Sequence, residues 1–128
     1  MSAQVSLEHL YYLSEAYQYL LTALFDIMNA PLYLGSAVDY FLRLLRSRVI
    51  SPATVHYAFR RFLHVLSRLN VNESAKRAIA ELLGGYVYSK IPQCESDDCF
   101  ESAIRALEEL RSRLSELEQK FLSELAVQ

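Results

Sequence analysis

The chain has 128 residues, of which 52% are hydrophobic and 22% are charged, and it contains only three glycines and three prolines. This composition excludes a disordered or low-complexity chain, and the length predicts a single domain over residues 1–128. The net charge is −2, which argues against a general nucleic-acid binder. Binding to a polyanion would therefore have to come from a local concentration of positive charge.

Positive charge is concentrated in the middle of the chain. Residues 43–77 contain eight Lys and Arg residues and a single acid, Glu73, whereas residues 1–42 contain four acids and neither Lys nor Arg. Residues 78–128 contain ten acids and five bases. The sequence therefore predicts one basic surface built from the central segment, with an acidic segment on each side of it.

The N-terminal region is apolar, but it lacks the features of a targeting or membrane segment. There is no positive region before the first apolar stretch, and Asp26 and Pro31 interrupt that stretch before it reaches the length of about 20 apolar residues that a bilayer requires. We expect a cytoplasmic protein without a membrane partner. Arg outnumbers Lys ten to three, which favours a thermophilic source.

The first predicted helix begins after Ser6, which is a typical N-cap residue, and runs to about Asn29, where Pro31 stops it. Its length and apolar character predict a place in the middle of a bundle or at a subunit interface. The expected inward face is Leu10, Leu13, Tyr17, Leu20, Leu24 and Ile27, widened by Tyr11, Leu21, Phe25 and Met28. The other side carries an acidic, tyrosine-bearing line, Glu8, Tyr12, Glu15, Tyr19, Thr22 and Asp26.

Two helices are predicted in the basic segment. Ser36 followed by Asp39 is typical of a capping box for a second helix of about thirteen residues. Ser51 and Pro52 then supply the N-cap and first position of a third helix, which ends near Asn70. The expected inward residues are Val38, Phe41, Leu42, Leu45 and Val49 in the second helix, and Val55, Phe59, Phe62, Leu66 and Leu69 in the third.

The C-terminal half predicts two more helices with a loop between them. One spans Glu73–Leu83 after Asn72 and is closed by Gly84-Gly85, and Tyr86–Pro92 follows as an ordered loop. The last helix is capped by Asp97 or Asp98 and runs to about Ala126, with an apolar heptad of Phe100, Ala103, Leu107, Leu110, Leu114, Leu117 and Phe121. The fold class is all-α, a compact bundle of four to five helices with long heptad-spaced first and last helices.

The predicted nucleic-acid-binding surface lies on the second, third and fourth helices. A line on the third helix, with offsets of four, three and four residues, combines basic side chains with an aromatic ring that can stack on a base. The alternative is that these side chains pair with the acidic line of the first helix and the acidic surface of the last. The predicted site residues are Arg43, Arg46, Arg48, Tyr57, Arg60, Arg61, His64, Arg68, Lys76 and Arg77.

Residues 51–62 read SPATVHYAFRRF, with a Ser, then a Thr-Val pair, then an Arg-rich ending. This stretch resembles the recognition-helix half of bacterial and archaeal helix-turn-helix regulators. The resemblance implies DNA readout in which the third helix lies in the major groove and the second crosses the backbone. The chain departs from the pattern at Val49, where a turn glycine is usual, and at Leu45, where a small Ala is usual. The groove-facing residues would be Ala53, Thr54, His56, Tyr57 and Arg60.

Cys94 and Cys99 are the only cysteines, and they flank a short acidic stretch. Without a further Cys or His nearby they cannot complete a tetrahedral zinc site, so a local disulfide or two free thiols remain as alternatives. No metal site and no cofactor are expected. Glu8, Glu15 and Asp26 lie one to three helical turns apart, too far for an acid/base pair, and we expect no enzyme activity.

These observations predict a non-catalytic small helical subunit whose basic face, residues 43–77, binds a nucleic-acid phosphate backbone within a larger complex. Small all-helical subunits with one basic face hold the nucleic acid in ribonucleoprotein effector complexes such as CRISPR surveillance complexes, although that comparison is one of architecture without a shared motif. The alternative is an assembly module that pairs with another subunit or with a copy of itself through the first or last helix, without contacting nucleic acid.

Overall fold

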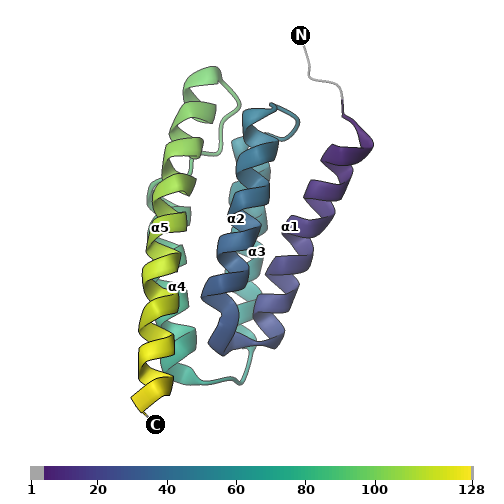
Figure 1. The fold of residues 1–128 in the computed structure, drawn as a ribbon. Coiled ribbons are helices and arrows are strands. Elements are labelled where there is room, and N and C mark those ends of the chain that lie inside the picture. The colour runs from purple at the N-terminus through teal and green to yellow at the C-terminus, as the bar shows by residue number, and fades with distance from the viewer. Residues whose placement is uncertain (1–4, 128) are drawn as a thin grey trace.

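The computed structural model describes residues 5–127, with side chains placed for residues 5–124. This part of the chain forms five α-helices and a 3-10 turn at Ile27–Asn29, without a strand, so the predicted all-α bundle is confirmed. Consecutive helices run in opposite directions, and the longest helix runs along one side of the bundle (Figure 1). The helices are α1 (Leu7–Phe25), α2 (Ala30–Arg46), α3 (Pro52–Arg68), α4 (Glu73–Ser89) and α5 (Asp97–Val127).

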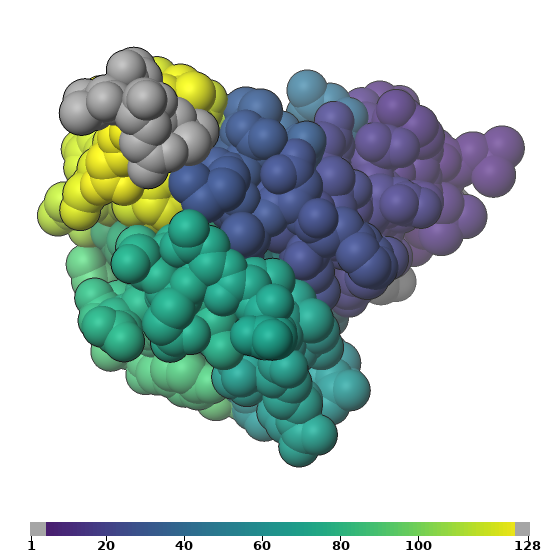
Figure 2. All heavy atoms as spheres, turned by 90° about the horizontal axis from the view of Figure 1, so that it is seen from below, coloured from purple at the N-terminus to yellow at the C-terminus, as the bar shows by residue number. Residues whose placement is uncertain are grey.

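Helix α2 is the centre of the hydrophobic core. It lies between α1 and α5, with α3 and α4 on the other side of the bundle, as the view along the helices shows (Figure 2). The heptad predicted for the last helix is confirmed, because Ala103, Leu107 and Leu110 are fully buried. The α2 side chains that fill the core between these helices are Leu34, Ala37, Val38, Phe41, Leu44 and Leu45.

The corner between α1 and α2 differs from the prediction. Helix α1 ends at Phe25 rather than near Asn29, and α2 begins at Ala30 rather than after Ser36. Pro31 lies in the first turn of α2, where a missing N–H does no harm, so it starts this helix instead of stopping the one before. The carboxylate of Asp26 fixes the corner by accepting hydrogen bonds from Nδ2 of the Asn29 side chain (2.9 Å) and from the Tyr33 hydroxyl (3.2 Å).

Asp39, predicted to cap a helix, instead joins α2 to α5. Its Oδ1 lies 3.1 Å from Nε of Arg111, whose Nη1 donates to the Ser115 hydroxyl. The guanidinium passes over Gly35, where an added Cβ would lie 2.6 Å from Nη1 of Arg111. A glycine at this position therefore lets the arginine cross α2 at close range.

Helix starts after α2 follow the sequence more closely. The Ser51 hydroxyl accepts a hydrogen bond from the Thr54 amide, and Pro52 is the first residue of α3, as predicted. The Asn72 side chain caps α4 in the same way by accepting from the Ala75 amide. Helix α5 begins at Asp97, which places its cap at Ser96 rather than at either aspartate.

The end of α4 was predicted wrongly. The helix continues through Gly84 and Gly85 to Ser89, so most of the segment expected to be a loop is helical. The added turns bury Tyr86 and Val87 against the core, and the burial of these large side chains outweighs the weak helix propensity of the two glycines. The chain then leaves the helix ahead of Pro92.

Helix α1 is rotated relative to the predicted orientation. Its fully buried residues are Ala16, Leu20 and Ala23, so a line of small side chains lies against α2. The two alanines allow the helices to pack closely and allow Tyr19 of the acidic line to stack on Tyr33 and Tyr40 of α2. Several residues predicted to face inward are exposed instead, namely Leu10, Tyr11, Tyr17, Leu21 and Phe25.

Candidate binding surface on α1 and α3

The arginines of α2 and of the turn that follows it contact other parts of the protein. Arg46 forms an ion pair with Glu108 of α5 at 2.8 Å, and Arg48 pairs with Glu101 at 3.4 Å. The Arg48 guanidinium also lies 4.4 Å from the centre of the Phe100 ring. Arg43 lies over the rings of Tyr12 (5.1 Å) and Tyr40 (5.4 Å). Two of the arginines that were predicted to contact phosphate therefore form ion pairs with the acidic surface of α5.

The basic residues of α4 also have partners within the protein. The Lys76 ammonium donates to the backbone carbonyl of Leu69 at 3.0 Å and lies 4.0 Å from a carboxylate oxygen of Glu73. Arg77 lies 3.9 Å from the same carboxylate group. Because Lys76 bonds to the end of α3, its position is explained by the connection between these two helices.

The arginines of α3 differ from those described above in their contacts. Among the residues that the structure describes, no carboxylate forms an ion pair with Arg60, Arg61 or Arg68, and all three are exposed. The helix itself contains no acid. We call the exposed set Tyr57, Arg60, Arg61, His64 and Arg68 the α3 ridge.

His56 lies one turn before Arg60 on α3, but its side chain is turned into the bundle and is only 4% exposed. Burial lowers its pKa below the ordinary histidine value, the charge of Arg60 lowers it further, and contact with the Val87 backbone partly opposes both effects. A buried ring cannot reach a base edge, so the residue set implied by the helix-turn-helix resemblance does not form one exposed face. Tyr57 and Arg60 remain available at the surface.

The outward side of α1 carries an apolar surface that the prediction placed in the core. Eight of the twelve large hydrophobic side chains exposed in the described part of the chain lie on α1 or α3. Leu7 is 85% exposed, Phe25 is 89% exposed and Leu21 is 52% exposed. The sequence signal for this surface is a second heptad, the outer seam of α1, which comprises Leu7, Leu10, Ser14, Tyr17, Leu21 and Leu24.

A groove of about 210 Å³ separates the outer seam from α3. Its walls are almost entirely apolar, and the Arg61 side chain lies at its edge. Burial raises the pKa of the Tyr17 hydroxyl, and the neighbouring Tyr57 hydroxyl raises it further, so this end of the groove is uncharged near neutral pH. The groove-lining residues are Tyr17, Leu20, Leu21 and Leu24 of α1 with Tyr57, Ala58, Arg61, Phe62 and Val65 of α3.

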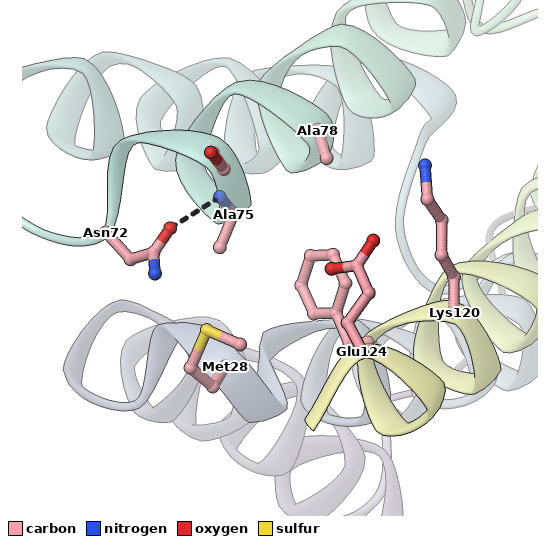
Figure 3. A pocket seen from close by; sticks show the side chains of 8 residues that line it. Met28, Asn72, Ala75, Ala78, Lys120 and Glu124 are labelled. Carbon is pink, nitrogen blue, oxygen red and sulfur yellow. Dashed lines mark hydrogen bonds between the residues drawn. The ribbon is translucent and has the colours of Figure 1, made fainter. Parts of the chain in front are cut away.

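A larger pocket, of about 330 Å³, opens at the end of the bundle that carries the C-terminus, where the start of α4 meets the end of α5 (Figure 3). Met28 and Phe121 supply apolar walls, and Lys120 and Glu124 lie on the α5 side. The Asn72 oxygen is already used to cap α4. None of the predicted basic residues lines this pocket, and its side chains do not form a catalytic group.

The described residues contain no candidate metal site. No group of three His, Cys, Asp or Glu side chains within residues 5–127 is arranged to hold a metal ion. Cys94, which precedes α5, is joined by a disulfide to Cys99 in the first turn of α5, with their Cα atoms 5.9 Å apart. No helix in this part of the chain is long and apolar enough to cross a membrane.

Comparison of the chain with protein-family models, with curated proteins and with solved structures finds no match. The functional argument therefore rests on the chain's own surface, where the α3 ridge and the outer seam of α1 lie on either side of one groove.

Proposed function

We propose that this chain is a non-catalytic assembly subunit that binds another protein through the outer seam of α1 and the α1–α3 groove. The observation that carries the proposal is the exposed apolar surface of α1. Leu10, Tyr17 and Leu21 follow one another along the helix at the spacing of a helix–helix contact, and no described element covers them.

The energy of such a contact is substantial. Fully burying a leucine or phenylalanine side chain contributes about 1.5–3 kcal/mol. Some side chains of this surface are already half-buried and would contribute less, so four or five of them together contribute several kcal/mol to binding. This offsets the loss of translational and rotational freedom on association. Tyrosine and arginine at the edge of an apolar patch, as at Tyr57 and Arg61, are residue types enriched in protein interfaces.

The test compares two matched substitutions of exposed leucines. Leu21→Glu places a charge on the outer seam, whereas Leu122→Glu places one on α5, where the leucine is similarly exposed at 49%. When purified from the cells from which the sequence comes, the wild-type chain and the Leu122→Glu variant should each be part of a complex of defined stoichiometry, which native mass spectrometry measures. Leu21→Glu should release a free 14.7 kDa chain. A wild-type chain that is already free contradicts the proposal.

The α3 ridge supports a second candidate, binding of a nucleic-acid phosphate backbone. The observation that favours it is the contrast between Arg46, which is paired with Glu108, and Arg60, Arg61 and Arg68, which have no ion pair among the described residues. The exposed ring of Tyr57 adds a stacking surface at one end of the ridge.

Salt dependence tests this second candidate quantitatively. Three arginines on phosphates predict a slope of log K against log salt of about −3 for duplex DNA and about −2 for a single strand. The full predicted surface, with eight Lys and Arg residues, would give a slope near −7 for duplex DNA. Arg60→Gln should reduce the slope by about one, whereas Arg46→Gln should leave it unchanged. The absence of salt-dependent binding to DNA and RNA would exclude this candidate.

A further inference from the structure

The outer seam of α1 is itself a pattern that another helix of the same kind can match. Its six positions alternate in steps of three and four residues over three heptads, and none of them carries a charge. The third position is Ser14, a small residue that allows another helix to approach closely. An uncharged heptad seam of this kind is typical of a helix that packs against a partner helix.

The two edges of the α1–α3 surface carry opposite charge. Glu15 is nine residues, or about two and a half turns, before Leu24, so the two side chains lie on opposite sides of α1. Leu24 faces the groove, and the acidic edge formed by Glu8 and Glu15 therefore faces away from it. The other edge of the surface is the outer part of the α3 ridge, Arg60, His64 and Arg68.

We infer that the partner on this surface is a second copy of the chain, related by a two-fold axis parallel to α1 and α3; the inference rests on the assembly function proposed above. The two helices run in the same direction (Figure 1). A two-fold axis along them places α1 of each copy over the groove and α3 of the other. Rotation about this axis keeps each residue at its own height along the helices. Because Tyr17 of α1 lies beside Tyr57 of α3 in the groove, Glu15 of one copy then lies within about 8 Å in height of Arg60 of its partner, at both sides of the interface.

Charge also selects this arrangement over the other two-fold pairing. An axis across the helices would place α1 over α1 and α3 over α3, so that Glu8 and Glu15 approached their own copies and the arginines approached theirs. Like charges facing each other across an interface disfavour it by several kcal/mol. The same charges therefore favour the parallel dimer and disfavour the antiparallel one.

The first experiment measures mass against concentration by sedimentation or light scattering, from about 1 to about 100 µM. The wild-type chain and Leu122→Glu should dimerise with the same Kd, and Leu21→Glu should raise the Kd at least about thirtyfold. Leu21 is half exposed, so its replacement leaves the fold intact, which circular dichroism checks. A wild-type monomer at the highest concentration overturns the inference.

The second experiment tests the arrangement by reversing each edge. A Glu15→Lys chain and an Arg60→Glu chain should each self-associate about tenfold more weakly, because each dimer would then bring two like charges together at both sides of the interface. An equimolar mixture should regain wild-type affinity, because both contacts of the mixed dimer again join opposite charges. A mixture no tighter than either variant alone contradicts the parallel two-fold arrangement.

These outcomes separate the inference from the proposed function. If the complex from cells contains one copy of the chain and depends on Leu21, the proposed assembly function stands, but the inference that the partner is a second copy is wrong. A chain that is free in cells and monomeric in solution would overturn both.

Discussion

His56 is the buried titratable side chain whose protonation bears on stability. It belongs to α3, and its ring is buried near Val87 of α4. This burial is the main reason that its pKa is below the ordinary value of 6.5. The positive charge of Arg60 acts in the same direction. The folded protein therefore holds this ring in its neutral form, at a pH where the unfolded chain would already bind a proton.

Stability should consequently fall in mild acid. Above pH 6.5 the ring is neutral in both states and has no effect on the pH dependence. As the pH falls below 6.5 the unfolded chain takes up a proton before the folded one does, so the free energy of unfolding decreases until the lower, folded-state pKa is reached. Thermal unfolding followed by circular dichroism between pH 8 and pH 5 measures this decrease.

Two histidine variants isolate the effect. His56→Gln should remove this component of the pH dependence because glutamine does not titrate, whereas exposed His64→Gln should leave it in place. An unchanged acid profile in His56→Gln would show that carboxylates, rather than this ring, govern stability in that range.

Single arginines show how far the binding surface is predictable from sequence. The residue types and their concentration in the central segment were visible, and so was the exposed line on α3. Pairing with the acidic surface of the last helix was the stated alternative, but the sequence did not say which arginines take part. Arg46 and Glu108 are 62 positions apart, and only the packing of α2 against α5 brings them together. The predicted basic surface therefore contains one part whose arginines form no ion pair among the described residues, the α3 ridge, and two parts that have partners within the protein.

At the scale of the helix, Gly85 offers a direct test of the end of α4. It lies inside the helix, is exposed, and an added Cβ would meet nothing within 4 Å. Gly85→Ala should therefore raise the free energy of unfolding by about 0.5–1 kcal/mol, because alanine loses less backbone freedom in a helix. Urea denaturation measures the change.

Gly35→Ala is the matched control, since it also lies within a helix. There the added Cβ would displace the guanidinium of Arg111 and weaken its bond to Asp39, so the gain in helix propensity is offset. A Gly85→Ala variant no more stable than wild type would indicate that the helix ends before Gly85.

The helix boundaries show what the local pattern determines. Ser51-Pro52 and Asn72 were located correctly because a capping side chain acts within four residues. Pro31 and Gly84-Gly85 were misinterpreted because each fits either side of a helix boundary, and the choice depends on burial that comes from other helices. Tyr86 and Val87 settle the second case by packing into the core.

The disulfide at the start of α5 should make a modest contribution to the free energy of unfolding. Cys94 and Cys99 close a loop of six residues, for which loop-closure entropy gives about 2 kcal/mol. Reduction with dithiothreitol should lower the free energy of unfolding by up to this amount, and a Cys94→Ser, Cys99→Ser chain should not respond to the reductant. Identical wild-type stability with and without the reductant would indicate two free thiols in solution.

At the scale of the whole molecule, α1 has two apolar sides, and only one of them belongs to the core. Both sides share a heptad spacing, so the sequence alone could not say which faces inward. The structure resolves this by packing density, since the line containing Ala16 and Ala23 approaches α2 more closely than larger side chains would allow. The larger side chains are left for another surface, which explains why so apolar a helix lies at the edge of the bundle (Figure 2).

Helix α1 should therefore be the part of the molecule whose protection against amide hydrogen exchange depends most on assembly. In the monomer it packs mainly on α2, and its outer side faces solvent, so its amides should exchange through local opening below the global free energy of unfolding. Dimerisation adds stability by mass action, so hydrogen exchange in α1 should slow as protein concentration rises from below to above the dimer Kd. Amides of α5 should change less, and Leu21→Glu should abolish the concentration dependence. Equal slowing in α1 and α5 would place the interface elsewhere.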